Sequence, residues 1–175
     1  MRLLLIAQIA AVLVIVACDS NEDSPADATA TPAETATVAG GATFTPQPQL
    51  PVIDLDYGDG ILRVEIASTA EQRSRGLSGR PSLGADEGML FDLGSTRVPS
   101  FSMRGMLFAL DFIWITEDQR VQGITAGVQP QQGADSGDLD SYSPTAPVRY
   151  VLEINAGAAG QLGIEEGDAL AFDLP

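Results

Sequence analysis

The chain has 175 residues, 45% of them hydrophobic, and a formal net charge of −15 that arises from 24 acidic residues against nine basic ones. All nine basic residues are arginine, histidine and lysine do not occur, and there is one cysteine. The lack of histidine excludes Ser-His-Asp and Cys-His catalysis and histidine-ligated zinc or copper. One cysteine excludes an intrachain disulfide, and the strong negative charge argues against nucleic acid as a partner. Carboxylates, arginine, tyrosine and hydroxyl groups remain for chemistry.

The first 18 residues have the pattern of an export signal. Arg2 precedes an apolar run over residues 3–17 that one glutamine interrupts, and this run is short for a helix that spans a bilayer. Residues 15–18, Ile-Val-Ala-Cys, resemble the lipobox of bacterial lipoproteins, in which the cysteine is acylated and becomes the new N-terminus. We therefore expect residues 1–18 to be a lipoprotein signal peptide, and Cys18 to anchor the protein to the cell membrane on its extracytoplasmic side. Ordinary signal-peptide cleavage and an uncleaved anchor are the alternatives.

The composition changes twice along the rest of the chain. Residues 19–51 are rich in Ala, Thr and Pro and carry five acidic side chains and no basic one. Such a segment buries too little apolar surface to offset the entropy of ordering, so we expect a disordered acidic tether. Residues 52–175 hold eight of the nine arginines and are long enough to sustain one core without disulfides, which predicts a single domain.

Alternation of apolar and polar side chains dominates this domain. Residues 62–66, 148–154 and 170–174 each place apolar side chains on one face of a strand, and residues 110–115 are apolar on both faces apart from Asp111. Residues 89–93 and 120–128 are weaker candidates, and clusters of Gly, Pro, Asp and Ser separate these runs. About seven strands follow. The predicted fold class is mainly β, an antiparallel β-sandwich or partly closed barrel with one or two short helices.

Two short helices are expected. Thr69 and Gln72 have the spacing of a capping box, which predicts one or two helical turns from about Ala70. Near the C-terminus, Asn155 has the side chain of an N-cap for a turn over residues 158–162, which Gly163 then ends.

The domain resembles a known family, the bacterial and archaeal domain of unknown function number 192. The likeness runs from about residue 62 to residue 174. It is carried by the motifs VEIA (64–67) with RGLSGR (75–80), EGMLF (87–91), FSMR (101–104) with LDFI (110–113), and YVLEINAG (150–157) with the glycines at 163 and 167. The resemblance implies a mainly β, jelly-roll-like sandwich that is often exported, here as a lipoprotein member, and it implies no established activity.

The central signature of that family departs from its usual form in this chain. It usually reads Phe-Trp-Met-Lys-Asn-Thr followed by Pro-Leu-Asp, whereas this chain has FSMRGM at 101–106 and Ala-Leu-Asp at 109–111. The cation, Arg104, and the acid, Asp111, remain. If the polar members of the signature line a ligand site, the ligand preference of this chain has changed or been lost.

Arg104 and Asp111 are the first candidate site, with Phe101 and Met103 supplying apolar surface beside them. One interpretation is a concave site in which the planar guanidinium holds an anion or a polyol and the carboxylate accepts hydroxyl groups. The alternative is a structural salt bridge beside a buried strand.

Arg75 and Arg80 are further candidates, in a cluster of arginines beside two glycines that is unusual in a chain with so few bases. They could hold a carboxylate or phosphate group near a helix terminus. Pairing with Glu71, Asp86 or Glu87 explains them equally well.

Other chemistry has weaker support. Asp135, Asp138 and Asp140 lie close together, as calcium ligands do, but they follow no defined loop pattern, and a solvated acidic loop is the alternative. Asp111 and Glu153 could meet across a sheet as paired carboxylates, although nothing in their spacing favours this. We expect no metal, no cofactor and no catalytic residue.

The sequence leaves two classes of function open. The first is a non-catalytic module, tethered to the membrane at the cell envelope, that binds a small polar ligand or an envelope protein. The second is a carboxylate-dependent enzyme acting on a saccharide or a cell-wall fragment. Binding is favoured, because every common nucleophile and base other than a carboxylate is missing.

Overall fold

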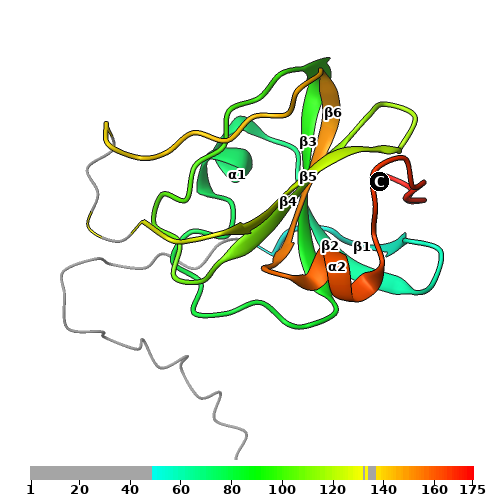
Figure 1. Ribbon diagram of the computed structural model, residues 1–175, viewed down its shortest axis with the longest axis horizontal. Helices are drawn as coiled ribbons and strands as arrows, with labels where there is room; N and C mark the ends of the chain where they lie inside the picture. The colour runs from blue at the N-terminus through cyan, green and yellow to red at the C-terminus, as the bar shows by residue number, and fades with distance from the viewer. Residues whose placement is uncertain (1–48, 132, 134–136) are drawn as a thin grey trace, which may run out of the picture. The chain divides into compact units, whose positions relative to one another are not determined.

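The computed structural model describes residues 49–131, 133 and 137–175 (Figure 1). Across these residues the chain forms one six-stranded sheet in the order β1-β2-β3-β6-β4-β5 and two short helices. The elements are β1 (Val52–Asp56), β2 (Ile61–Ala67), α1 (Ala70–Arg75), β3 (Glu87–Arg97), β4 (Leu110–Ile115), β5 (Val121–Val128), β6 (Val148–Asn155) and α2 (Ala158–Leu162). The prediction of a mainly β fold with two short helices is confirmed.

The sheet is mixed rather than wholly antiparallel. β2 and β3 run parallel, with Ile66 opposite Leu90, while every other neighbouring pair is antiparallel. A parallel pair cannot be joined by a tight hairpin, so the chain crosses over through residues 68–86, which include α1. The sheet is not closed into a barrel over the described residues.

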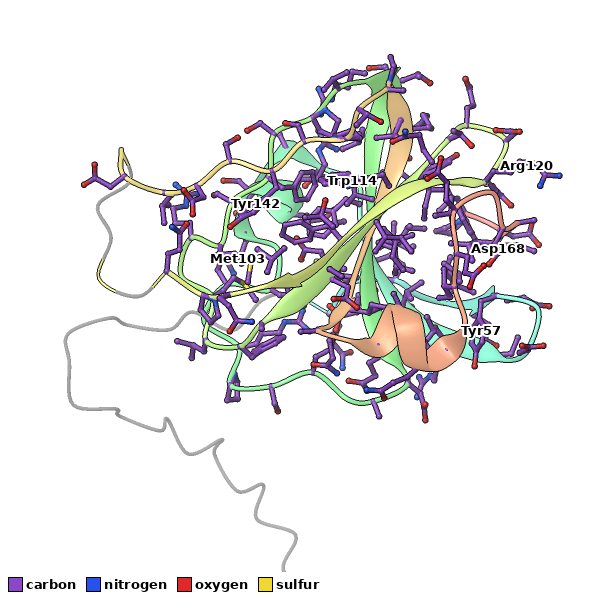
Figure 2. The ribbon with its side chains drawn as sticks, viewed as in Figure 1. Tyr57, Met103, Trp114, Arg120, Tyr142 and Asp168 are labelled. Carbon is purple, nitrogen blue, oxygen red and sulfur yellow. The ribbon has the colours of Figure 1, made fainter. Side chains whose placement is uncertain are left out.

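Both faces of the sheet are buried, because successive side chains of a strand point to opposite sides. Along β6, Leu152 and Ile154 join one apolar cluster, and Val151 joins the other. The first cluster is covered by α2 and the C-terminal segment, and we call this side of the sheet the α2 face. The opposite side holds Trp114 and is called the Trp114 face. Figure 2 shows Met103 and Tyr142 beside Trp114 on that side.

The first helix forms as its sequence predicts. The Thr69 side chain accepts a hydrogen bond from the backbone N–H of Gln72, and the Gln72 side chain accepts one from the backbone N–H of Thr69. This capping box satisfies amide groups that the first turn leaves free. Gly76 ends the helix with a φ of 50°, a conformation that glycine adopts without the steric penalty of a Cβ.

The second helix forms where expected, but Asn155 does not cap it. The Asn155 amide group instead donates hydrogen bonds to the carbonyl oxygens of Leu83 and Gly84, because Asn155 is still the last residue of β6. Gly157 occupies the cap position without a side-chain bond. The free amide groups of this turn are bound by a distant carboxylate, described below.

The predicted strand at residues 170–174 is wrong. Within the described residues its backbone forms a single bridge, Ala171 with Asp56, and Ala169, just before the segment, forms another with Arg120. Since the segment divides its hydrogen bonds between β1 and the turn before β5, it builds no continuous ladder. Leu170 and Phe172 are nevertheless buried, so the alternation correctly identified an inward face. A strand that the alternation did not identify, β1, lies at the other end of the domain.

The N-terminal predictions lie mostly outside the described residues. This applies to the signal peptide, to Cys18 and to residues 19–48 of the tether. The described part begins close to the core: Leu50 is buried, and the carbonyl oxygen of Pro51 accepts a hydrogen bond from the N–H of Ile66. No helix within residues 49–131 and 137–175 has the length and apolar character needed to cross a membrane.

Candidate functional site

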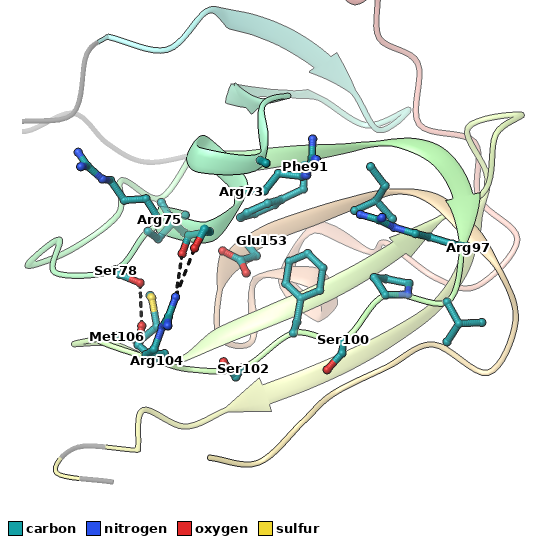
Figure 3. Close-up of a pocket in the computed structure, with 18 residues that line it drawn as sticks. Arg73, Arg75, Ser78, Phe91, Arg97, Ser100, Ser102, Arg104, Met106 and Glu153 are labelled. Atoms are coloured by element: carbon teal, nitrogen blue, oxygen red, sulfur yellow. Dashed lines mark hydrogen bonds between the residues drawn. The ribbon is translucent and has the colours of Figure 1, made fainter. Parts of the chain in front are cut away.

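A pocket of about 550 Å³ opens on the Trp114 face, between the crossover and the loop that joins β3 to β4 (Figure 3). Its size is in the range of pockets that hold small organic ligands. The lining side chains divide into a cationic and hydroxyl-bearing rim, an apolar interior and one buried acid. They are Ala70, Arg73, Ser74, Arg75, Gly76, Leu77, Ser78, Phe91, Leu93, Arg97, Val98, Pro99, Ser100, Phe101, Ser102, Arg104, Met106 and Glu153.

One wall comes from α1 and the turn after it. The capping box fixes the start of α1, and Arg73 ties the helix to the sheet by donating from Nη1 to the carbonyl oxygen of Asp92 at 2.9 Å. The same guanidinium group donates to the carbonyl oxygen of Ser68. This wall is therefore held to β3 through a side chain that also lines the pocket.

The second wall is the segment from Val98 to Met106, which hydrogen bonds attach at both ends. At one end, Phe101 exchanges two backbone hydrogen bonds with Tyr142, of 2.9 and 2.8 Å. At the other end, Ser78 Oγ donates to the carbonyl oxygen of Arg104 at 2.7 Å, and the N–H of Gly79 donates to the carbonyl oxygen of Gly105 at 2.8 Å. The two walls are therefore directly connected beside the pocket.

The interior is mainly apolar. The rings of Phe91 and Phe101 meet edge to face, with their centroids 5.1 Å apart. Leu77, Leu93 and Met106 complete the apolar surface and are all buried. A ligand that enters this interior gains most by burying a hydrocarbon or aromatic part.

Glu153 is the buried acid of the pocket. Its side chain comes from β6, between Met89 of β3 and Phe112 of β4, and the residue is only 5% exposed. Figure 3 shows its carboxyl group inside the ring of lining residues. Burial raises the pKa of Glu153 to about 8, because an apolar environment disfavours the charged form. No hydrogen bond or ion pair joins this carboxyl group to another side chain or backbone group within the described parts of the chain.

The rim of the pocket is cationic. Four of the nine arginines of the chain line it, namely Arg73, Arg75, Arg97 and Arg104. Arg104 is exposed and reaches the backbone oxygen and the hydroxyl group of Ser74 only at 3.4 Å. Arg97 is exposed, and its guanidinium group has no hydrogen-bond or ion-pair partner among the residues that the structure describes. Exposed guanidinium groups with long or no internal bonds can turn toward an anion.

The structure brings three of the predicted site residues to this pocket, namely Phe101, Arg104 and Arg75. Met103 belongs to the segment of the second wall, but its side chain is 1% exposed in the core and does not line the pocket. Arg80 lies elsewhere, where two of its nitrogens donate to the two carboxylate oxygens of Glu65. This bond raises the pKa of Arg80. Arg80 is therefore paired with an acid, as the alternative interpretation expected, but the partner is Glu65 and not Glu71, Asp86 or Glu87.

The expected pairing of Arg104 with Asp111 does not occur. Asp111 is fully buried, and its carboxylate accepts backbone hydrogen bonds from Gly127 at 2.7 Å, Gly157 at 3.0 Å and Ala159 at 3.1 Å. It thereby joins β5 and the start of α2 to β4. Asp111 has a structural role on the α2 face and does not line the pocket.

The acidic loop offers no described metal site. Asp135 lies outside the described residues. Asp140 exchanges hydrogen bonds with the side chain of Gln131, at 2.9 and 2.8 Å. No cluster of potential metal ligands occurs in the described part of the chain, which includes Asp138 and Asp140.

Sequence reasoning did not place Glu153 or Arg97 beside Arg104, because it considered Glu153 only as a possible partner of Asp111 and did not consider Arg97 as a site residue. Alternation along β6 placed Glu153 on the polar side of a strand with one buried face. β6 lies between β3 and β4 in the middle of the sheet, so both of its faces are covered. The presence of Val151 on the same side as Glu153 was the available signal. No signal in the sequence placed Arg97 at the pocket, because its position depends on where the long strand β3 ends.

Comparisons with known proteins agree with this architecture. A family model named DUF192 and described as "Uncharacterized ACR" matches residues 54–172. None of the curated proteins matches the chain.

Two crystal structures are similar to it. One is of a candidate transcription regulator from Sinorhizobium meliloti 1021, with 32% identity, a TM-score of 0.63, and coverage of 73% of this chain and 98% of that one. The other is of a protein of unknown function from Novosphingobium aromaticivorans DSM 12444, with 31% identity, a TM-score of 0.63, and coverage of 76% and 94%.

Proposed function

Since this chain belongs to the DUF192 family, whose members are described as uncharacterised, we propose from its own pocket that it is a binding module for a small organic anion with an apolar body. The observation that carries the proposal is the gathering of four arginines around one pocket with an apolar interior, in a chain of net charge −15. The chain as a whole repels anions, so a local cationic rim is needed to attract one.

The geometry of the rim supports a role in binding. A structural salt bridge would hold Arg104 in a closed pair with an acid, whereas Arg104 is exposed and bonds only the Ser74 oxygens at 3.4 Å. Arg97 is equally accessible. A planar guanidinium can grip a carboxylate or phosphate with two parallel hydrogen bonds, and the apolar interior would take the body of the ligand.

Binding is favoured over catalysis by the same lining residues. Glycoside hydrolysis by the usual route needs two carboxyl groups about 5 to 10 Å apart. Glu153 is the one carboxyl group among the described lining residues, and Asp111, the second acid that the sequence analysis considered, lies on the other face of the sheet. The hydroxyl groups of Ser78 and Ser100 already bond to the Arg104 carbonyl oxygen and to Ser141.

We further propose that the module is held outside the cytoplasm by a lipid on Cys18, with residues 19–51 as a flexible tether. The lipobox-like end of the apolar run supports the anchor, and the Ala/Thr/Pro-rich composition supports the tether. An envelope protein is the alternative binding partner. The charge of −15 opposes nucleic acid as a partner, although one similar structure is named for transcription regulation.

Ligand binding can be tested by thermal unfolding of the purified chain with a panel of carboxylates, for example 3-phenylpropionate and hexanoate, beside their uncharged amides. A ligand at about 100 times its dissociation constant adds about 2.7 kcal/mol to the free energy of unfolding, which raises the Tm by several degrees. We expect the acids, and not the amides, to raise the Tm, and the substitutions R104Q and R97Q to abolish the shift. R63Q removes an exposed arginine outside the pocket and is the matched control. Equal shifts in R104Q, R97Q and R63Q would reject the pocket as the binding site.

The anchor has its own test. Mass spectrometry of the mature protein from membranes should show an acylated N-terminal Cys18, and a C18S variant should remain unprocessed by that route or be released. An unmodified N-terminus at another residue would contradict the proposed anchor and leave the binding proposal unaffected.

A further inference from the structure

The inner and outer parts of the pocket have different chemical characters. The outer part carries the exposed guanidinium groups of Arg97 and Arg104, and the inner part carries the buried carboxyl group of Glu153 (Figure 3). The rings of Phe91 and Phe101 also line the pocket. No ion pair joins Glu153 to an arginine among the residues that the structure describes. The pocket therefore combines exposed guanidinium groups at its rim with a buried, unpaired carboxyl group and an apolar lining.

Glu153 has no hydrogen-bond donor among the described residues, although the residue is only 5% exposed, and its carboxyl group faces the pocket (Figure 3). A carboxyl group that leaves bulk water without a protein partner destabilises the fold, so its presence here calls for an explanation. Register explains the position of Glu153 but not the choice of an acid there. The residues opposite Glu153 on the neighbouring strands, Met89 and Phe112, are both apolar. An apolar residue in place of Glu153 would suit these neighbours better.

We propose that the ligand is a zwitterion with a primary ammonium group at one end and a carboxylate at the other, separated by apolar atoms, as in ω-amino acids and short linear peptides. Its ammonium group donates to Glu153, and its carboxylate binds Arg104 and Arg97 at the rim. This inference rests on the proposed function and specifies the class of ligand.

Three observations favour an ammonium group over an uncharged donor at Glu153. An uncharged donor would be satisfied by the amide oxygen of a glutamine at this position. A carboxyl group can in addition lose its proton and bind a cation as an anion. Because the pKa of Glu153 is about 8, the loss of its proton at pH 7 weakens the binding of an ammonium group by only about tenfold. The charge-assisted hydrogen bond that then forms is roughly twice as strong as a neutral one. The rings of Phe91 and Phe101 beside the acid also favour a cation over an anion.

The charges around the pocket fix the orientation of such a ligand. The charged groups that face it are Arg73 and Arg75 from α1, Arg97 from the end of β3, and Arg104 from the second wall, while β4 presents Phe112 next to Glu153. A ligand carboxylate beside Glu153 would be repelled once that acid ionises, so it stays at the rim. The ammonium group would be repelled by the rim arginines and attracted inward.

A matched series of ligands tests this inference. We would measure binding by isothermal titration calorimetry for ω-amino acids of about four to eight carbons, and for the carboxylates and ω-hydroxy acids of equal length. We expect the best ω-amino acid to bind at least about tenfold more tightly than its carboxylate and hydroxy counterparts. Norleucine is an isomer of 6-aminohexanoate with adjacent charges, and we expect it to bind no better than hexanoate.

The variant E153Q separates the two polar ends. We expect E153Q to reduce ω-amino acid binding to the level of the plain carboxylate, while R104Q weakens the binding of both ligands. The only tryptophan, Trp114, is buried with its indole N–H bonded to Thr125, so its near-ultraviolet circular dichroism verifies that each variant is folded. Binding to the wild type should also release up to about one proton between pH 6 and 7, measured from the heat in buffers of different ionisation enthalpy, and plain carboxylates should release none.

The possible failures are distinguishable. If carboxylates and ω-amino acids bind equally and R104Q weakens both, the zwitterion inference is overturned and the proposed function stands. If ω-amino acids bind E153Q as tightly as the wild type, Glu153 does not receive the ammonium group and the inference is overturned. If no member of the series binds at millimolar concentration, the inference and the proposed anion-binding function both fail.

Discussion

Asp111 and Glu153 lie on neighbouring strands of the same sheet and on its opposite faces. Ile154 is the residue opposite Asp111, and Glu153 is opposite the next residue of β4, Phe112, so the two acids project in opposite directions. Asp111 accepts three backbone hydrogen bonds, and Glu153 accepts none from the described chain. One buried acid therefore stabilises the fold, and the other is available to a ligand.

Glu153 should make the stability of the protein depend on pH. Below about pH 4.5 its carboxyl group is protonated in the folded and the unfolded chain, and between about pH 4.5 and 8 only the folded chain keeps the proton. The folded state then binds more protons than the unfolded state, so stability falls as the pH rises through this window. We expect E153Q to remove this dependence and to be more stable than the wild type by about 3 kcal/mol at pH 7. Urea unfolding at several pH values between about 5 and 8 measures both slopes, and parallel slopes would disprove the assignment.

Asp111 should matter for stability and not for binding. D111N keeps the size of the side chain but replaces one acceptor oxygen with an amide nitrogen that cannot accept from Gly157, Gly127 or Ala159. Because hydrogen bonds to charged groups contribute about 1.5 to 3 kcal/mol each, we expect a loss of about 2 to 4 kcal/mol. Urea denaturation measures the loss. D59N, at an exposed acid, is the control and should change stability by less than about 0.5 kcal/mol.

Arg104 should matter for ligand binding and have little effect on stability. Its guanidinium group is exposed and makes only 3.4 Å contacts to Ser74, so R104Q should lower the free energy of unfolding by less than about 1 kcal/mol while it abolishes ligand binding. Breaking a buried ion pair would cost about 3 to 5 kcal/mol. A loss of that size in chemical denaturation would mean that Arg104 is structural.

The capping box of α1 should contribute measurably to the first wall of the pocket. T69A removes the side-chain oxygen that accepts from the N–H of Gln72, and we expect a loss of about 1 kcal/mol. T69S retains the hydroxyl group and should stay within about 0.5 kcal/mol of the wild type. Denaturation curves for the two variants decide the point, and equal losses would show that the hydroxyl group is not what stabilises the turn.

Local patterns in the sequence predicted what local chemistry determines. The capping box at Thr69, the strand that contains Leu152 and the short helix after Gly157 all follow from residue types a few positions apart. These signals predict the class of the fold and its two short helices. Phe101 and Arg104 came into consideration in another way, through the resemblance of residues 101–106 to the central signature of the family.

Features that depend on distant pairings could not be predicted in this way. Alternation places Glu153 on the polar side of a strand, and only the position of β6 between β3 and β4 reveals that this side is buried as well. The partners of Asp111 come from β5 and from the turn before α2, which no spacing in the sequence connects. The segment over residues 170–174 alternates correctly, yet it lacks a single neighbouring strand with which to pair.

The parallel pairing of β2 with β3 has a consequence for how this pocket arises during folding. Parallel neighbours need a long connection, and here that connection, residues 68–86, supplies one wall of the pocket. The wall therefore reaches its place only once β2 and β3, the two strands that the crossover joins, have paired. The position of this wall is therefore set by the connection between β2 and β3 and not by the residues that line the pocket. Exchange of side chains along Val98–Met106 can change the ligand preference without altering the folding route, because those residues belong to the other wall.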